Sequence, residues 1–294
     1  MSVEFTPPAS PFTVPFDGTF KLAEHSSSAP TDVADRKALE KQLKKSVKNI
    51  AQLQKQLYAD NRFSVLLVFQ AMDAAGKDGT IRAVMSGVNP AGCQVHSFKS
   101  PSSEELDHDF LWRTAKALPE RGRIGIFNRS YYEEVLAVRV NPSFLVNQRL
   151  PELNADELWP ERFDSIRDHE SHLARNGVVI LKFWLNVSKD EQKARFMKRL
   201  TNEDRYWKFS KHDLGARKQW NEYMQAYEAV MNETSRSHAP WFAIPANNKP
   251  YMRLQVATII ENTLQALPLA WPTKSPEELA RFGEHIDFLS NETI

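Results

Sequence analysis

A loop of small residues holds a lysine between two carboxylates, in the stretch Gln70-Ala-Met-Asp-Ala-Ala-Gly-Lys-Asp-Gly-Thr80. Gly76 and Lys77 fit the phosphate-loop pattern Gly, four residues, Gly-Lys-Ser/Thr, whereas Ala71 replaces the first glycine and Asp78 the hydroxyl residue. The three small residues before Lys77 still let backbone N–H groups point at an anion, and a helix beginning there adds partial positive charge. The loop predicts a phosphate-binding site; the alternative is a tight strand–helix turn with a solvated lysine.

Magnesium would need an anchor beside this loop, because no hydroxyl residue directly follows the lysine. Two acids, Asp73 and Asp78, sit next to Lys77, and Asp73 is the natural candidate for the metal ligand. The expected cofactor is therefore Mg²⁺, with Mn²⁺ as a substitute.

An arginine follows the strand predicted at 123–127, where an ordinary nucleotide-hydrolysing loop protein carries an aspartate that holds magnesium. This chain has Asn128 there and Arg129 next. An arginine at the carboxyl end of a strand, facing a phosphate loop, suits bidentate capture of two phosphate oxygens.

Glu133 has two interpretations of equal weight. As the partner of Ser130 it would only cap the following helix, whereas at a helix start that faces the cleft it would contact substrate. Arg139 is expected on the same helix, either as a surface charge or as a phosphate ligand.

Positive charge is concentrated at residues 193–218, which hold nine bases against three acids. Ser188 and Glu191 form a capping-box pattern that opens a helix there. The charge could be a solvated face, but its position directly after a strand favours a lid of arginines that closes over transferring phosphates. Interleaved aromatic residues could bind single-stranded nucleic acid; combined with the phosphate loop, they indicate a phosphate-chain channel or a lid hinge.

A framework of alternating strands and helices must position these residues. Strand patterns cover 64–70, 94–98, 123–127, 178–185 and 241–245, and helical patterns cover 32–59, a segment ending at 84, 103–117, 160–176, 213–233 and 250–266. This alternation predicts an α/β fold with a mostly parallel, five-stranded sheet covered on both faces. Ligands of such sheets bind beyond the carboxyl ends of the strands, where the loop and Arg129 fall.

The 294 residues include 38 Lys and Arg, 37 Asp and Glu, and one cysteine. One cysteine excludes an intrachain disulfide framework and suits a reducing compartment, so a cytoplasmic protein is expected. No apolar run approaches a membrane span, and the N-terminus lacks a signal-peptide pattern. The net charge of +1 hides the basic segment because both ends of the chain are acidic.

Three segments are expected along the chain. Residues 1–35 are acidic and rich in proline, which predicts an extended arm, partly ordered at best, packed on the body or on a neighbouring subunit. Residues 36–268 form the phosphate-loop domain, with the lid at about 188–212. Residues 269–294 form an acidic tail.

Taken together, the motifs resemble the family-2 polyphosphate kinases. The resemblance covers roughly residues 35–268 and rests on the phosphate loop, Phe127-Asn-Arg-Ser-Tyr-Tyr-Glu-Glu-Val-Leu136, Asp213-Leu-x-x-Arg217-x-x-Trp220, Asn89-Pro-Ala-Gly92, His108-Asp-Phe-Leu-Trp-Arg113 and Ala239-Pro-Trp-Phe-Ala-Ile-Pro-Ala246.

The resemblance implies a three-layer αβα kinase fold with a helical lid. It also implies Mg²⁺-dependent transfer of the terminal phosphoryl group of inorganic polyphosphate to a nucleotide. Glu133 looks like the residue found at this position in the subgroup that accepts both AMP and ADP. By the same resemblance Asp73 would hold magnesium, Lys77 and Arg129 would stabilise the transferring phosphates, and Glu133 would lie near the acceptor. The further residues expected to contact nucleotide or polyphosphate are Ala74, Ala75, Gly76, Asp78, Gly79, Thr80, Asn128, Tyr132, Arg139, Arg195, Arg199, Arg205 and Lys208.

Two rival functions remain at this level. One is an ATP-dependent nucleoside monophosphate kinase, and the other is a non-catalytic phosphate-loop module that binds nucleotide or RNA. The expected partners are inorganic polyphosphate and adenine nucleotides, with guanine nucleotides as a second acceptor, and neither nucleic acid nor a membrane. A homo-oligomer, dimer or tetramer, is also expected.

Overall fold

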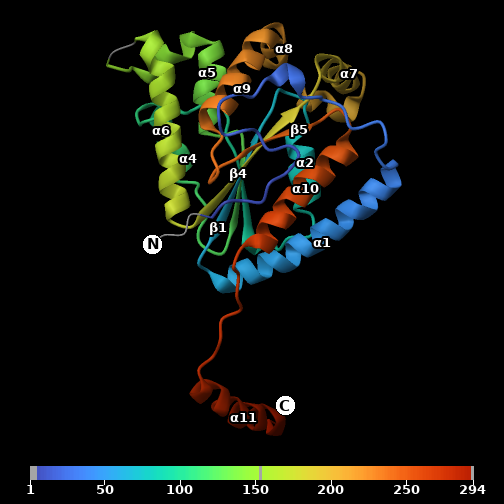
Figure 1. Ribbon diagram of the computed structural model, residues 1–294, viewed down its shortest axis with the longest axis vertical. Helices are drawn as coiled ribbons and strands as arrows, with labels where there is room; N and C mark the ends of the chain where they lie inside the picture. The colour runs from blue at the N-terminus through green and yellow to red at the C-terminus, as the bar shows by residue number, and fades with distance from the viewer. Residues whose placement is uncertain (1–4, 152–153, 293–294) are drawn as a thin grey trace.

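A five-stranded parallel sheet forms the centre of the molecule, in a computed structural model that describes residues 5–151 and 154–292 (Figure 1). The strand order is β2-β3-β1-β4-β5, and the strands span Ser64–Gln70 (β1), Cys93–Ser97 (β2), Ile124–Asn128 (β3), Val178–Asn186 (β4) and Trp241–Pro245 (β5). The predicted α/β fold with five parallel strands is confirmed.

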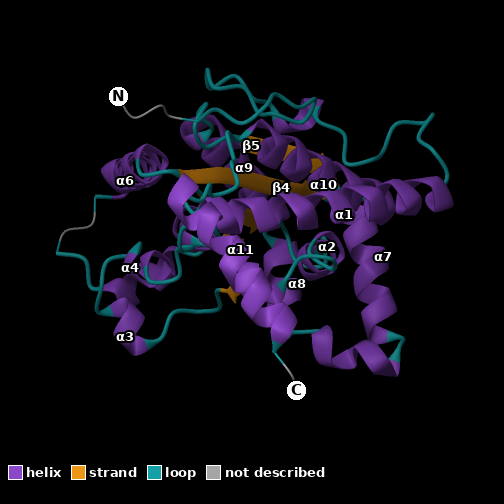
Figure 2. Cartoon of the chain, turned by 90° about the horizontal axis from the view of Figure 1, so that it is seen from below, coloured by secondary structure: helices purple, strands orange, loops and turns teal. Residues whose placement is uncertain are grey.

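Helices cover both faces of this sheet. Figure 1 shows α1, α2 and α10 on one side and α6 and α9 on the other, and Figure 2 shows the strands as a single layer between helices. The helices are α1 (Arg36–Asp60), α2 (Lys77–Val84), α3 (Ser103–Leu106), α4 (Trp112–Ala115), α5 (Ala137–Val140), α6 (Ala155–Arg175), α7 (Lys189–Leu200), α8 (Lys211–Lys218), α9 (Trp220–Thr234), α10 (Lys249–Ala266) and α11 (Pro276–Asn291). Short 3₁₀ turns connect them: η1 (Leu22–Glu24), η2 (Pro90–Gly92), η3 (Tyr131–Val135), η4 (Pro142–Gln148) and η5 (Glu203–Lys208).

The sheet register brings the ends of its central strands to one edge. Phe69 pairs with Asn128 of β3, and Gln70 pairs with Trp184 of β4. All seven residues of β1 are buried, because helices cover both faces of the sheet at this central strand. Its sequence is accordingly almost entirely apolar. The segments that follow β1, β3 and β4 therefore start side by side.

Two helices predicted as continuous are broken. The segment 103–117 forms α3 and α4, because Asp107 ends α3 and the Asp109 side chain accepts a hydrogen bond from the Leu111 N–H, which starts a new turn. The segment 213–233 forms α8 and α9, which are separated at Gln219. The capping box predicted at the start of the first segment is confirmed, since Ser102 and Glu105 form both of its hydrogen bonds. The one predicted at Ser188 is only half formed, because the Glu191 side chain binds Arg195 and does not reach back to the Ser188 N–H.

The N-terminal arm packs on the body, one of the two predicted arrangements, and specific contacts hold it there. Thr13 forms an antiparallel bridge with Phe242 of β5, and Val14 donates its N–H to the Trp241 carbonyl at 2.9 Å. Val14 and Phe20 are buried. The arm thus covers the open edge of β5, and its few apolar side chains anchor it despite the acidic, proline-rich composition.

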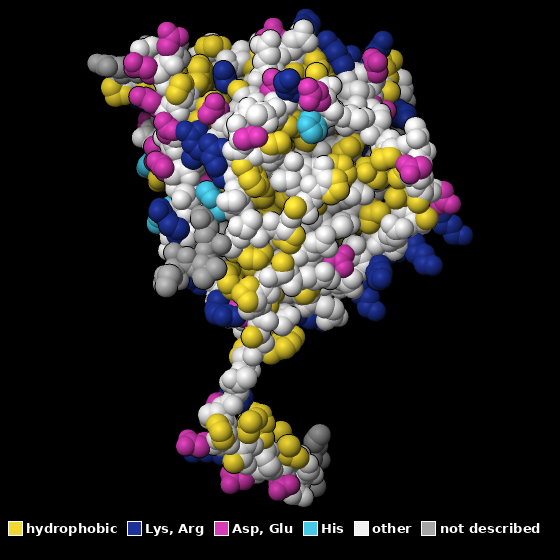
Figure 3. Space-filling model, viewed as in Figure 1, with side chains coloured by type: hydrophobic (Ala, Val, Ile, Leu, Met, Phe, Trp, Pro, Cys, Tyr) yellow, Lys and Arg dark blue, Asp and Glu magenta, His cyan; other side chains and the backbone are white. Residues whose placement is uncertain are grey.

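The C-terminal segment contains a helix, α11, that lies apart from the body in Figures 1 and 3. A capping box of Ser275 and Glu278 and a proline at its first position start this helix. Its apolar side chains are exposed, namely Leu279, Phe282, Ile286, Phe288 and Leu289. None of the helices in the described parts of the chain is long and apolar enough to cross a membrane.

Candidate active site

The phosphate loop joins β1 to α2 through residues with unusual backbone angles. Ala74 and Gly76 have φ values of 62° and 114°. A Cβ atom at Gly76 would lie 3.3 Å from the Met252 side chain, so this position requires glycine for both conformation and space. Lys77 follows as the first residue of α2 and is only 9% exposed. Its Nζ donates a hydrogen bond to the Ala71 carbonyl at 2.7 Å.

Side chains of α7 bind the carbonyl groups of this loop. Gln192 donates to the Asp73 carbonyl at 2.9 Å, and Arg195 donates to the carbonyls of Ala74 and Ala75 at 3.1 and 2.5 Å. Because these carbonyls point toward α7, they are held away from the N-terminus of α2, where the first N–H groups lack intrahelical acceptors. The loop is therefore held in a shape suited to an anion.

Two polar contacts join the end of β3 to the loop. Arg129 donates from Nη2 to Asp73 Oδ1 at 2.7 Å, and Asn128 donates from Nδ2 to Asp78 Oδ1 at 2.5 Å. Arg129 has a left-handed φ of 65°, which is strained for a non-glycine residue. Its own N–H donates to the Phe69 carbonyl at 3.0 Å, so the neighbouring strand holds that conformation.

Glu133 completes a cluster of opposite charges. Burial raises the pKa of the Glu133 carboxyl, while Arg129 and Lys77 oppose this rise. Burial lowers the pKa of Lys77, as does the charge of Arg129. Burial alone would lower the pKa of Arg129, but the carboxylates of Glu133 and Asp73 more than offset it, and the net shift is upward. Two cations and two carboxylates thus face one another at the edge of the sheet.

The capping interpretation of Glu133 is wrong. The Ser130 hydroxyl accepts a hydrogen bond from the Tyr132 N–H in η3, where a capping box would require the Glu133 N–H. A tight 3₁₀ turn replaces the first turn of an α-helix there. The Glu133 carboxylate does not cap that turn and interacts with the charges of Arg129 and Lys77.

A cavity of about 380 Å³ opens beside these groups, between α2 and the ends of β2 and β3. Its polar lining includes Asp78, Arg82, Ser97 and Asn128. This volume falls within the range of sites for small organic ligands.

Comparisons with known proteins show the family to which this chain belongs. Residues 33–269 match the sequence profile of polyphosphate kinase 2. The chain belongs to the polyphosphate kinase 2 family. The resemblance seen in the sequence is thereby confirmed, and the match spans the predicted domain while leaving most of the arm and the tail outside.

Individual relatives agree with this membership. Over 236 residues, the chain is 53% identical to an ADP-polyphosphate phosphotransferase of Rhodopseudomonas palustris, covering 80% of this chain and 82% of the relative. Over 225 residues it is 45% identical to an AMP/ADP-polyphosphate phosphotransferase of Meiothermus ruber, covering 76% and 80%. The crystal structure of polyphosphate kinase 2 from Arthrobacter aurescens superposes with a TM-score of 0.84 at 36% identity, covering 92% of this chain and 93% of that one.

Several residues predicted to bind ligand already have hydrogen-bond partners inside the protein. The five N–H groups of Arg195 have acceptors, because Nε pairs with Glu191 and Nη2 donates to the carbonyls of Ala246 and Asn247, in addition to the loop carbonyls. Thr80 is fully buried and donates to the Gly76 carbonyl. Direct phosphate binding by Arg195 and Thr80 is therefore not supported; both shape the loop.

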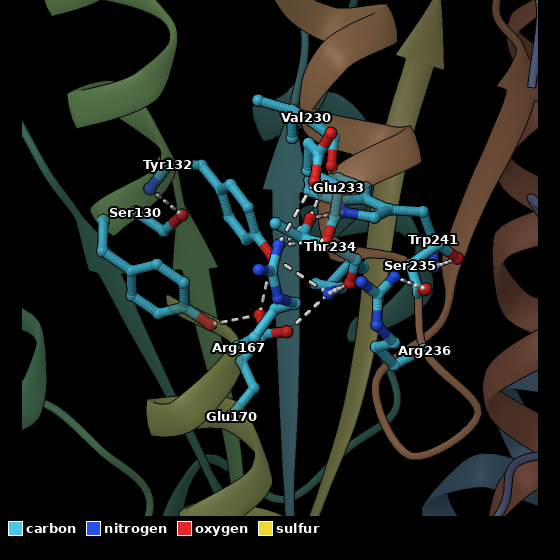
Figure 4. A network of polar contacts seen from close by, with 12 residues as sticks. Ser130, Tyr132, Arg167, Glu170, Val230, Glu233, Thr234, Ser235, Arg236 and Trp241 are labelled. Atoms are coloured by element: carbon cyan, nitrogen blue, oxygen red, sulfur yellow. Dashed lines mark hydrogen bonds and ion pairs between the residues drawn. The ribbon is translucent and has the colours of Figure 1, made fainter. Parts of the chain in front are cut away.

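Tyr132 is likewise buried and belongs to a polar network behind η3. Its hydroxyl and that of Tyr131 each lie 2.8 Å from Glu170 Oε1, and Lys182 Nζ lies 2.6 Å from Glu170 Oε2. Figure 4 shows Tyr132, Glu170 and Thr234 in one network, in which the Tyr132 hydroxyl also lies 3.0 Å from Thr234 Oγ1. This network fixes the turn that carries Arg129 and Glu133, so Tyr132 contacts this interior rather than a nucleotide.

The remaining predicted cations lie on or near the basic segment. Arg199 pairs with Asp213 at 3.1 Å, whereas Arg205 and Lys208 are exposed on η5. Arg139 lies on α5 beside the rings of Trp159 and Phe163 at 6.0 and 5.8 Å.

Two tyrosines and an aspartate near the site were missed. Tyr223 and Tyr227 lie one turn apart on α9. Burial raises the pKa of both phenols, that of Tyr223 to about 12, and the carboxylates of Glu133 and Asp73 add to the rise. Asp213 faces the charges of Asp73 and Arg129. The sequence signal that could have indicated these residues was the Asp213–Trp220 motif, which leads into α9 but received no functional role.

The donor set fits a magnesium ion that completes its shell from substrate. Asp73 Oδ1 is bound by Arg129, and the Asp73 side chain remains 22% exposed. The described residues contain no group of three or more His, Cys, Asp or Glu that could hold a metal. Mg²⁺ is commonly held by one or two carboxylates plus phosphate oxygens and water, so a single, partly exposed carboxylate at this position is adequate.

Proposed function

We propose that this chain transfers the terminal phosphoryl group of inorganic polyphosphate to AMP and ADP, with Mg²⁺ as the metal and Mn²⁺ as a substitute. The observation that carries the proposal is the Arg129–Asp73 contact of 2.7 Å across the phosphate loop from Lys77. It unites an anion-binding helix start, an arginine and a metal-binding carboxylate at one edge of the sheet. Family membership supplies the donor class.

In the proposed reaction, a phosphate oxygen of the nucleotide attacks the terminal phosphorus of polyphosphate. The new P–O bond forms as the bond to the bridging oxygen breaks, so the nucleotide gains one phosphate and the donor chain loses one. Lys77 and Arg129 neutralise charge on the transferring oxygens, and the protein mainly positions the reactants. When bound, the metal would be held by Asp73 and would screen repulsion between the phosphates.

The acceptor nucleotide is proposed to occupy the cavity between α2, β2 and β3. Asp78 and Asn128 line that cavity and are joined to each other by a hydrogen bond, so they form one polar wall of the proposed acceptor site. Glu133, whose carboxylate interacts with the charges of Arg129 and Lys77, is proposed to contact the acceptor. Guanine nucleotides are proposed as a second class of acceptor. The names of both relatives support ADP as an acceptor, and the name of the Meiothermus ruber relative supports AMP as well.

The predicted lid at about residues 188–212, which overlaps the basic segment 193–218, is proposed to close over the phosphates. Arg199, Arg205 and Lys208 lie on the part of α7 and η5 that extends away from the sheet (Figure 1). Exposed cations on such a projection can close over a bound polyanion. A cytoplasmic homo-oligomer, dimer or tetramer, remains a prediction.

A donor-competition assay tests this function. The purified chain is given Mg²⁺ and AMP or ADP, with polyphosphate, with ATP, or with both, and the formation of ADP and ATP is followed. Polyphosphate alone should support both acceptors. Transfer from ATP to AMP without polyphosphate would favour the rival monophosphate kinase, and inactivity with every donor combined with salt-sensitive RNA binding would favour the binding module.

A further inference from the structure

Asn247, between β5 and α10, contacts the start of α7. Its Oδ1 accepts a hydrogen bond from the Ser188 N–H at 2.9 Å. Ser188 is the N-cap residue of α7, and its hydroxyl accepts from the Glu191 N–H at 3.2 Å. In a complete capping box the Glu191 side chain would bind the Ser188 N–H. Asn247 therefore supplies the second half of the cap from a distant segment of the chain.

This arrangement leaves the Glu191 carboxylate free to bind Arg195. Glu191 Oε1 accepts a hydrogen bond from Arg195 Nε at 2.7 Å. Arg195 Nη2 donates to the carbonyls of Ala246 and Asn247 at 2.6 and 3.1 Å. Asn247 thus holds Arg195 in two ways, directly through its own carbonyl and indirectly by releasing Glu191 from the cap.

The start of α7 in turn shapes the phosphate loop. Gln192 and Arg195 lie in its first two turns and donate hydrogen bonds to the loop carbonyls. Both side chains are buried and closely packed, so their positions follow the helix that carries them. A shift of Ser188 and the first turn would therefore move the loop carbonyls, and with them the N–H groups that face the anion.

The N-terminal arm orients the Asn247 side chain. The Asn247 N–H donates to the Ser27 carbonyl at 3.0 Å, and its Nδ2 donates to the hydroxyls of Ser27 and Ser28 at 3.2 and 3.3 Å. Because the amide nitrogen faces the arm, Oδ1 faces the start of α7. Close by, Asn186 at the end of β4 donates from Nδ2 to the His25 carbonyl at 2.9 Å. The arm therefore contacts the ends of both strands that flank the start of α7.

We propose that Asn247 is a positioning residue for phosphoryl transfer, which couples residues 25–28 of the arm to the phosphate loop. The coupling runs through hydrogen bonds from the arm to Asn247, from Asn247 to Ser188 and Arg195, and from Arg195 to the loop. Its effect on the donor phosphates is indirect, because Asn247 sets the geometry of the groups that bind them. The inference rests on the proposed function, since its main readout is transfer from polyphosphate.

The two KM values separate positioning from a simple loss of folded enzyme. Asn247→Ala should raise KM for polyphosphate on the order of tenfold, because the loop N–H groups no longer converge on the donor phosphates. KM for the nucleotide should stay unchanged, because the proposed acceptor cavity lies at β2 and β3, across β1 from Asn247. A smaller folded fraction would lower the apparent kcat and leave both KM values unchanged.

Two further variants test the individual contacts of Asn247. Asn247→Asp keeps an acceptor oxygen for the Ser188 N–H, and serine hydroxyls of the arm can donate to its second oxygen. KM for polyphosphate should therefore return to within about twofold of the wild-type value. The double variant Ser27→Ala/Ser28→Ala removes only the side-chain contacts of the arm and should raise this KM about threefold.

Asn232→Ala is the matched control. Asn232 on α9 also holds the arm, since its side chain accepts from the Phe20 N–H at 2.8 Å and donates to the Phe20 carbonyl at 3.0 Å. This variant should lower stability and leave both KM values unchanged. The proposal is overturned if Asn247→Ala leaves KM for polyphosphate unchanged, if Asn247→Asp is as impaired as Asn247→Ala, or if Asn232→Ala raises that KM equally.

Amide hydrogen exchange gives a readout that does not depend on activity. Residues 71–76 should exchange faster in Asn247→Ala than in the wild type and in Asn232→Ala, because the loop carbonyls lose their fixed donors. Equal exchange rates in the three proteins would also overturn the proposal. If the wild type transfers nothing from polyphosphate, the proposed function fails, and the exchange rates still decide whether Asn247 shapes the loop.

Discussion

Two buried lysines of this chain have opposite surroundings. Lys182, in the middle of β4, is fully buried, and its three N–H groups are satisfied by Glu170, the Tyr132 hydroxyl and the Thr234 carbonyl at 2.6 to 2.9 Å. Lys77, at the start of α2, is 9% exposed and has the Ala71 carbonyl as its single acceptor among the described residues.

The difference indicates what each lysine is for. A buried ammonium group that is fully hydrogen-bonded and paired is complete without a ligand, and it organises the interior. A buried ammonium group with unused donors, at the positive end of a helix, is most stable when an anion arrives. The first arrangement stabilises the turn that carries Arg129 and Glu133, and the second leaves capacity for phosphate.

The largest expected effect comes from removing the lysine with unused donors. Lys77→Met should lower kcat/KM for polyphosphate-dependent transfer by about 10³-fold, because a preorganised charge on the transferring phosphate is lost. Its melting temperature should not fall, since a desolvated cation is removed. Initial rates and thermal melting of the same preparation measure both. Normal transfer by this variant would contradict the assignment of Lys77.

The second-largest effect comes from removing one partner of the buried Lys182–Glu170 ion pair. Glu170→Ala should lower the free energy of unfolding by ~3 kcal/mol, because Lys182 is then left charged without a partner and two tyrosine hydroxyls lose their acceptor. Denaturant unfolding measures the loss.

The matched variant keeps the acceptor oxygen and removes only the charge. Glu170→Gln should lose less than Glu170→Ala, and adding Lys182→Met to Glu170→Gln should cost less than the sum of the single losses. If the two losses are strictly additive, Lys182 and Glu170 do not act as a pair.

The smallest effect is a dependence of stability on pH. Burial, the dominant cause, lowers the pKa of Lys182 from 10.5 to about 8, with Glu170 opposing the shift and Arg236 adding to it. Between these two pKa values the unfolded chain holds this proton more firmly than the folded chain. The protonated lysine therefore subtracts stability below pH 8, and this penalty is relieved as the pH rises toward 10.5.

The test of this pH dependence compares the wild type with the variant Lys182→Met. From pH 8 to pH 9 the wild type should gain ~1 kcal/mol of unfolding free energy relative to Lys182→Met, which has no such proton. Denaturant titrations at both pH values give the difference. A constant difference across this range would show that Lys182 does not titrate there.

Local sequence patterns were sufficient for most of the framework. The segments 64–70 and 241–245 match β1 and β5 residue for residue, because strands buried on both faces of a parallel sheet favour long apolar runs. The break between α3 and α4 was not predicted, since Asp109 bonds a backbone N–H that could equally have continued a helix.

By itself, the sequence determined the five strands and the phosphate loop, because these depend on short-range pattern and residue type; the roles of Lys77, Arg129 and Asp73 stay predictions. Only the tertiary structure decided which cations are available. Arg195 and Arg253 are both arginines in basic surroundings, yet the first donates all its hydrogen bonds to protein groups while the second meets mainly other cations. Hydrogen-bond partners and desolvation depend on residues distant in the chain, and no local pattern encodes them.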